Sequence, residues 1–266
     1  MLSCQRYKSV RAGSNEDGEV KKKKARVPFL LSYNPGNSMM VTGHSYPRRI
    51  VHAHLRNGLH DLRPGEEGAI RLAQEAKLDQ FFPAGIFVSG NHTFLEDRPA
   101  EWLDGHMVRA AESSLSDVEA CIRAHHPTCV NFIFTSNDLS RLCSFSMLRC
   151  VSLAQRLMDF AEALPQYVRL VIIDMVLPRT GRLQSDPETF SSNAEHYNTV
   201  LEAMANQDRI TINPCRGFRF MDNNGQPMPC PVSNWSEDGI HPTFAQFIRY
   251  FNNTRRIVRT HHVRLA

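Results

Sequence analysis

Short apolar runs alternate along the chain with segments of helical hydrophobic spacing. Five apolar runs predict strands: 38–45 (SMMVTGHS), in which the strand ends at Gly43, 84–90 (AGIFVSG), 129–138 (CVNFIFTSND), 167–179 (YVRLVIIDMVLPR) and 209–214 (RITINP). The segments between and after them predict helices over 45–58, 104–126, 146–164, 192–207 and 241–258. Strands that alternate with helices are typical of right-handed βαβ units. We therefore expect an α/β fold, a three-layer α/β/α sandwich around a parallel sheet of about five strands.

The two ends of the chain differ in charge from the part between them. Residues 1–28 are polar and hold eight of the 31 Lys and Arg residues but only three of the 27 acidic residues. We expect a disordered basic tail over 1–28, one domain over 29–260 and a frayed C-terminus over 261–266. Without the tail, 23 basic and 24 acidic residues remain, which argues against nucleic-acid binding by the whole domain. Weak nucleic-acid contact through the basic termini stays possible.

Two further features bear on the compartment and on cofactors. The sequence has no apolar run long enough for a transmembrane helix and no secretory signal at its N-terminus, and it has seven cysteines, an odd number. We therefore expect reduced thiols and a cytoplasmic or nuclear protein. Cys121, His125, His126 and Cys129 lie within nine residues and invite a zinc interpretation. Because they straddle a predicted helix end and a strand start, we expect no metal site and no other cofactor.

Polar residues with catalytic potential follow the predicted strands. Ser45 follows the first strand, Gly90 the second, and Asn137 ends the third, while Asp238 and His241 precede the last helix. Ligands of an open parallel sheet bind beyond the carboxyl ends of its strands. We therefore expect these residues to converge on one edge of the sheet.

These residue types are the components of a serine hydrolase. Ser45 would be the nucleophile, His241 its general base and acid, and Asp238 the group that orients the imidazole. The backbone N–H groups of Ser45 and Gly90 and the side-chain amide of Asn137 would form the oxyanion hole. Singly, each residue also fits a structural role as a turn, a helix cap or a packed side chain. Their joint position at one sheet edge favours the catalytic interpretation.

Four sequence blocks also occur in the order found in the SGNH (GDSL-type) hydrolases, namely VTGHSYPRRI, FVSGN, IFTSNDL and DGIHPTFAQ. Through them residues 38–258 resemble that superfamily, and the GHS-x-x-RR form resembles SGNH-like domains of animal genomes, some in retroelement-encoded proteins. The resemblance implies a flavodoxin-like three-layer fold and metal-free ester hydrolysis through an acyl-serine. Two positions depart from the family pattern: His44 stands where the family has Asp, and Thr135 where it has Gly.

The sequence thus supports two functions. The first is an intracellular serine esterase that acts on an ester-bearing small molecule, lipid or glycan. The second is a catalytically weak SGNH scaffold that binds nucleic acid or anionic lipid through its basic termini. The intact Ser45, Asp238 and His241 favour the esterase, whereas His44, Thr135 and the basic ends keep the scaffold as the alternative.

Overall fold

Five parallel strands form the centre of the molecule, as the sequence predicted. The computed structural model describes residues 37–44, 46, 76–78, 80–89, 115–179, 186–205, 209–215, 235 and 240–265. The strands lie in the order β2-β1-β3-β4-β5, and each neighbouring pair is parallel. Their bounds are Ser38–Gly43 for β1, Gly85–Ser89 for β2, Cys129–Ile133 for β3, Leu170–Asp174 for β4 and Ile210–Asn213 for β5.

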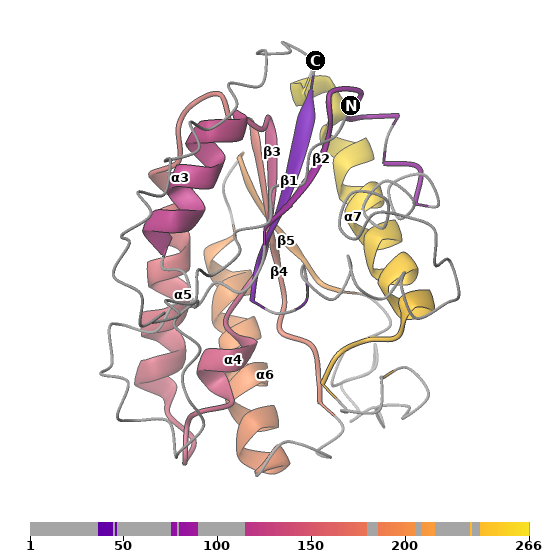
Figure 1. The fold of residues 1–266 in the computed structure, drawn as a ribbon. Coiled ribbons are helices and arrows are strands. Elements are labelled where there is room, and N and C mark those ends of the chain that lie inside the picture. Colours follow the sequence, from indigo (N-terminus) through magenta and orange to yellow (C-terminus); the bar gives the residue numbers. More distant parts are fainter. Residues whose placement is uncertain are drawn as a thin grey trace, which may run out of the picture.

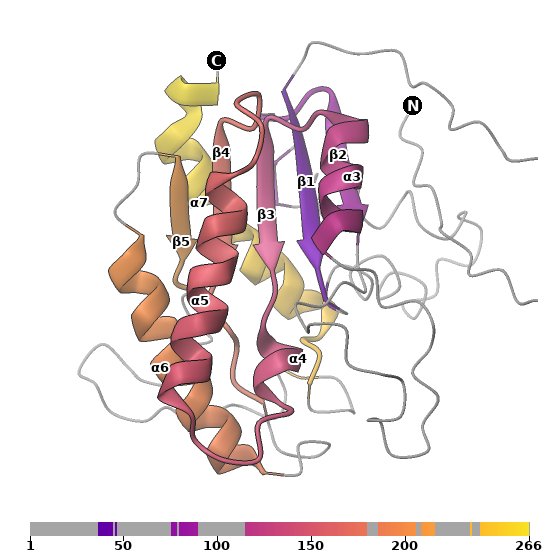
Figure 2. The ribbon, with the colours of Figure 1, turned by 90° about the vertical axis from the view of Figure 1, so that its left-hand side faces the viewer.

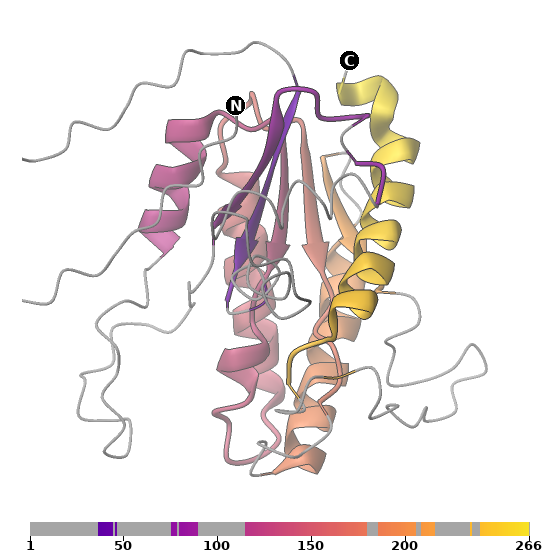
Figure 3. The ribbon, with the colours of Figure 1, turned by 45° about the vertical axis from the view of Figure 1, so that its right-hand side comes forward.

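Helices cover both faces of this sheet. The described helices are α3 (Leu115–His125), α4 (Ser136–Leu139), α5 (Met147–Glu162), α6 (Pro187–Met204) and α7 (Phe244–Leu265). Helix α7 lies on one face, and α3, α5 and α6 lie on the other (Figures 1 and 3). This arrangement is the expected three-layer α/β/α sandwich. No helix in the described part of the chain is both long and apolar enough to cross a bilayer.

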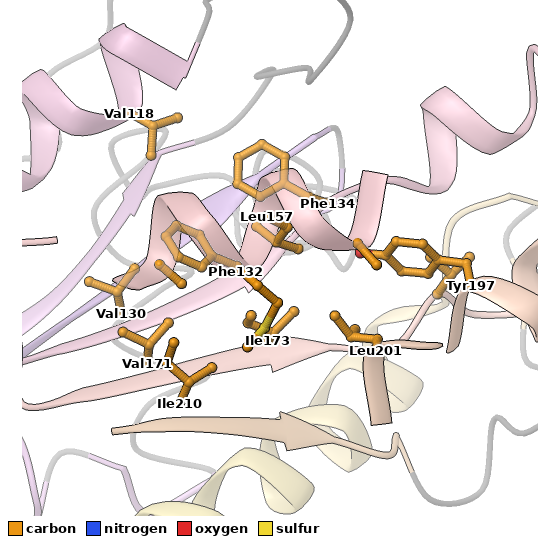
Figure 4. Close-up of a cluster of buried hydrophobic side chains, with 14 of the residues drawn as sticks. Val118, Val130, Phe132, Phe134, Leu157, Val171, Ile173, Tyr197, Leu201 and Ile210 are labelled. Carbon is orange, nitrogen blue, oxygen red and sulfur yellow. The ribbon is translucent and has the colours of Figure 1, made fainter. Parts of the chain in front are cut away.

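Each face of the sheet has its own apolar core, because successive strand side chains point to opposite faces. On the α7 face, Met39, Val41 and Ile172 pack with side chains of that helix. On the other face, Phe132 and Ile173 pack with α3, α5 and α6. Figure 4 shows the second cluster, in which strand residues meet Leu157 of α5 and Tyr197 and Leu201 of α6.

The ends of three helices differ from those that the hydrophobic pattern predicts. Helix α6 begins at Pro187, five residues before the predicted start at 192, because Asp186 accepts a hydrogen bond from Thr189 N and Pro187 fits the first helical position. Helix α7 continues to Leu265, beyond the predicted helix end at 258. His261 contacts Thr211 of β5 at 3.2 Å, which packs this last turn against the sheet. Of the predicted helix over 104–126, residues 115–125 form α3 and residues 104–114 lie outside the described part.

The strand order reverses at β1. Strand β2 lies on one side of β1, and β3, β4 and β5 follow on the other side. Open parallel sheets bind ligands in the crevice beyond the carboxyl ends of the strands at such a reversal. We therefore expect a ligand site at the carboxyl ends of β1 and β3. Helix α4 follows directly after β3 at this edge of the sheet (Figure 2).

Candidate active site

The end of β1 lies unusually close to the end of β3 at Gly43. A Cβ atom on Gly43 would lie 1.9 Å from the carbonyl oxygen of Ile133, and φ of Gly43 is +155°. The next residue, His44, donates its backbone N–H to the same oxygen at 3.0 Å. Only glycine fits here, because any side chain would separate the two strand ends. The close approach brings His44 against the first residues of α4.

His44 is a buried, neutral histidine with both ring nitrogens engaged. Its Nδ1 accepts from the backbone N–H of Tyr46 at 3.3 Å, and its Nε2 lies 2.7 Å from Ser136 Oγ. Because Nδ1 accepts, we assign the ring proton to Nε2, which then donates to Ser136. Burial, the nearby charge of Arg179 and the proximity of His241 hold the pKa of His44 well below 6.5. The ring therefore adds no positive charge to the site at neutral pH.

Thr135, the residue that precedes α4, has a backbone conformation that favours glycine. Its φ is +76°, in the left-handed region that costs a branched residue about 1–2 kcal/mol. The Thr135 hydroxyl donates to Tyr197 OH at 3.0 Å, and this buried contact helps to offset the strain. Threonine thus adopts here a backbone conformation that glycine adopts more easily.

Asn137 lies in the first turn of α4, where Arg179 fixes the orientation of its amide. Arg179, in the segment after β4, donates from Nη2 to Asn137 Oδ1 at 3.0 Å and to Ser136 Oγ at 3.2 Å. Arg179 is buried, and its guanidinium carbon lies 4.7 Å from the centre of the Phe190 ring. Since Oδ1 accepts from Arg179, the Nδ2 donors of Asn137 point in a different direction. Arg179 thus fixes which way the Asn137 amide is turned.

His241 reaches the same edge of the sheet from the other end of the chain. The Tyr46 hydroxyl donates to the carbonyl oxygen of Ile240 at 2.7 Å, immediately before His241. The Tyr46 ring centre lies 5.4 Å from that of His241 and 4.4 Å from that of His44. An isolated antiparallel bridge between Trp235 and Pro242 further fixes the chain before α7. The segment after β1 and the segment before α7 therefore meet through the buried Tyr46, although Tyr46 and Ile240 are 194 positions apart in sequence.

The other predicted site residues lie outside the described part of the chain. These are Ser45, Gly90 and Asp238. Ser45 is the residue between His44 and Tyr46, both of which are described. The structure therefore brings together Asn137, His241 and the two neighbours of Ser45. The roles of Ser45, Gly90 and Asp238 stay predictions.

Sequence reasoning gave no role to Ser136, Arg179 or Tyr46. An arginine directly after a proline that ends a buried strand was a usable signal for Arg179, because such a position lies at the ligand-binding edge of the sheet. Tyr46 follows the predicted nucleophile but carries no pattern that identifies its partner. Its contact with Ile240 depends on the packing of β1 beside α7.

The four residues considered for zinc do not converge. Cys129 packs in the core on the α7 face, whereas Cys121 packs against the core on the opposite face. His125 stacks on Phe87, with ring centres 4.6 Å apart, and His126 packs on Tyr167 at 4.7 Å. Within the described ranges no group of three or more His, Cys, Asp and Glu residues is placed to hold a metal ion.

Known proteins resemble this chain in fold but not detectably in sequence. No family model and no curated protein matches the sequence. A GDSL-like lipase from Bacteroides thetaiotaomicron superposes with a TM-score of 0.52 at 13% identity, over 84% of this chain and 88% of its own. A lipase/acylhydrolase from Enterococcus faecalis gives 0.52 at 12% identity, over 84% and 96%. A carbohydrate acetylesterase family member from Sinorhizobium meliloti gives 0.52 at 13%, over 84% and 98%. The chain therefore has the fold of the SGNH hydrolases.

Proposed function

We propose that the protein is a serine esterase of the SGNH type. One observation carries the proposal: the buried Tyr46, next to Ser45 in sequence, contacts both His44 and His241 and anchors the carbonyl before His241. Through this residue the Ser-bearing and His-bearing segments meet at the sheet edge where Asn137 also lies. A nucleophile, a base and an oxyanion donor from three distant segments at one edge support acyl transfer.

In the proposed reaction, Ser45 Oγ attacks the ester carbonyl carbon while His241 takes the hydroxyl proton. Asp238 orients the imidazole and stabilises its charged form. The carbon–oxygen bond to the alcohol then breaks, and the alcohol leaves with the proton from His241. Water, deprotonated by His241, next attacks the acyl-serine, and the acid is released as Ser45 regains its proton.

The negative charge on the carbonyl oxygen requires fixed donors. We assign this role to the backbone N–H groups of Ser45 and Gly90 and to Nδ2 of Asn137. Arg179 contributes by positioning, since its hydrogen bond to Asn137 Oδ1 turns the amide so that Nδ2 faces away from Arg179. The neutral His44 supports the same arrangement, because it donates to Ser136 beside Asn137.

The substrate class and setting extend this proposal. We infer an ester-bearing small molecule, lipid or glycan as substrate, and a cytoplasmic or nuclear location. The GHS-x-x-RR form around Ser45 supports a relationship to the SGNH-like domains of animal genomes, including those of retroelement-encoded proteins. The basic run over residues 21–24 supports weak nucleic-acid contact by the N-terminus.

A fluorophosphonate probe tests the esterase proposal without knowledge of the substrate, because it reacts only with an activated serine. The wild-type chain should be labelled, and Ser45→Ala should not. Ser152→Ala is the matched control, since Ser152 is exposed on α5 away from the site and its loss should leave labelling unchanged. Equal labelling of Ser45→Ala and wild type would refute the assignment. No labelling of the wild type would favour the binding scaffold instead.

A further inference from the structure

The outer face of α5 is apolar at the start of the helix and polar farther along. At its start, Leu148 is 83% exposed, Met147 55% and Val151 38%, and Phe145 just before the helix is 51% exposed. Farther along, the exposed positions are polar, namely Ser152, Gln155, Asp159 and Glu162. We call Phe145, Met147, Leu148 and Val151 the apolar patch. A surface helix normally has a polar outer face, so an apolar patch at the start of α5 is a candidate docking surface.

Hydrogen bonds fix the apolar patch in place, so its exposure does not result from a frayed helix end. The side chain of Ser146 caps α5 by accepting from Arg149 N at 3.4 Å. Asn193 of α6 accepts from Ser146 N at 2.9 Å and donates to Ser144 O at 3.1 Å. The Phe145 ring packs edge-on against His196, with ring centres 5.7 Å apart.

The charged residues in the segment that carries the apolar patch are all positive. The sequence from residue 139 to residue 158 holds three arginines and no acidic residue. Arg141, four residues before Phe145, and Arg149, the residue after Leu148, are both exposed. An apolar centre with a cationic border fits an anionic lipid surface, where apolar side chains enter the interface and arginines contact the headgroups. A symmetric contact with a second copy would instead bring like charges together.

The apolar patch lies at the same end of the molecule as the candidate active site. Helix α5 begins beyond the carboxyl ends of the strands (Figure 2). Its first residues lie beside Asn193, in the first half of α6. Asn137 in α4 precedes Phe145 by eight residues, and no strand or long helix lies between them. The apolar patch and the sheet edge that carries Asn137 are therefore close together along the chain and lie at the same end of the sheet.

We propose that the apolar patch docks the protein on an anionic lipid surface. The docking presents the candidate active site to ester groups at that surface, a consequence that rests on the proposed esterase function. The lipid surface itself is recognised by Leu148, Met147, Phe145 and Val151 together with Arg149, none of which we place in the catalytic machinery.

Cosedimentation of the full-length chain with vesicles tests the docking. The vesicles contain equal parts of phosphatidylglycerol and phosphatidylcholine, and vesicles of phosphatidylcholine alone serve for comparison. Leu148→Ser should weaken binding to the mixed vesicles by about tenfold, because a largely exposed leucine no longer enters the interface. Arg149→Gln should weaken it by about fivefold on mixed vesicles and leave binding to phosphatidylcholine unchanged. Gln155→Ser, two turns farther on the same outer face, is the matched control and should bind as wild type.

Binding and catalysis are scored separately. Vesicle binding by Ser45→Ala should equal that of wild type, so a failed esterase assignment would leave this test intact. Hydrolysis of a short water-soluble ester should be the same for Leu148→Ser and wild type. Equal vesicle binding by Leu148→Ser and wild type would overturn the proposal. So would light scattering that shows a wild-type dimer in the absence of lipid and a monomeric Leu148→Ser, because the patch would then be a contact between two copies.

Discussion

Replacing Asp174 by Asn should remove a pH-dependent loss of stability that the wild-type fold carries. Asp174 ends β4 and is 2% exposed, beneath α7. Its carboxylate accepts from Asn213 Nδ2 at 2.5 Å and from Asn131 Nδ2, and Tyr250 of α7 also hydrogen-bonds to it. Burial raises its pKa from 3.8 to about 7, and the three hydrogen bonds lower it only in part. A buried carboxyl therefore titrates near neutral pH.

The sign and size of the effect follow from proton linkage. Between pH 3.8 and about 7 the folded chain binds a proton at Asp174 that the unfolded chain has released. Stability is therefore greatest below the unfolded pKa and falls as the pH rises through the folded pKa. A rise in pKa of this size corresponds to about 4 kcal/mol. In Asp174→Asn the side chain does not titrate, so the free energy of unfolding of the variant relative to wild type should rise by about 4 kcal/mol across this range.

The assay is urea unfolding at several pH values, followed by tryptophan fluorescence, to which the buried Trp235 contributes. Asp174→Asn adds a constant cost of about 1–3 kcal/mol, because its NH2 group replaces one acceptor and faces the amide donor of either Asn131 or Asn213. This cost is the same at every pH and leaves the predicted difference intact. Asp159→Asn, an exposed carboxylate on α5, is the control and should shift stability by less than about 0.5 kcal/mol throughout. Parallel curves for Asp174→Asn and wild type between about pH 4 and pH 8 would refute the reasoning.

Three further predictions concern the sheet edge. Tyr46→Phe keeps the buried ring but removes the hydrogen bond to Ile240. The kcat for a short ester should therefore fall by about tenfold with KM unchanged. An equal change in KM and kcat would contradict a positioning role for Tyr46. Asn137→Asp keeps an acceptor for Arg179 but replaces the Nδ2 donor with a carboxylate oxygen, so kcat should fall by about 100- to 1000-fold while the thermal midpoint stays close to wild type. A stable variant with wild-type turnover would remove Asn137 from the oxyanion hole. Gly43→Ala should unfold the domain or lower its stability by more than about 3 kcal/mol in urea unfolding, because its Cβ would lie 1.9 Å from a β3 carbonyl oxygen.

The alternation of apolar runs and helical segments was sufficient to predict the architecture. Each run is short, apolar on both faces and ended by glycine, proline or polar residues, which is the local pattern of a strand covered on both sides. The sheet edge could also be predicted, since the residues after each strand lie at its carboxyl end in any parallel sheet. Asn137 and His241 accordingly lie at that edge. The architecture and the sheet edge depend on the spacing of hydrophobic residues and on the glycine, proline and polar residues that end each run. These signals lie within a few residues of one another.

Partners that are distant in sequence could not be predicted in this way. Asn131 lies inside an apolar run and carries no local sign that Asp174, 43 residues later, accepts its amide. The neutral state of His44 requires burial together with the charge of Arg179, which is 135 residues away in the chain. The Asn131–Asp174 hydrogen bond and the neutral state of His44 depend on strand register and on which helix covers which face of the sheet. Local hydrophobic periodicity determines neither the register nor the covering helix.

The same division applies to the departures from the family pattern. The sequence identifies Thr135 at a position where the SGNH pattern has glycine, but only the structure shows that its backbone is left-handed and that its hydroxyl donates to Tyr197. The sequence places hydrophobic residues on both sides of α5 at its start, and only the burial of each side chain separates the core face from the apolar patch. Local sequence determines which conformations and faces are available, whereas solvent exposure and long-range hydrogen bonds are properties of the packed chain.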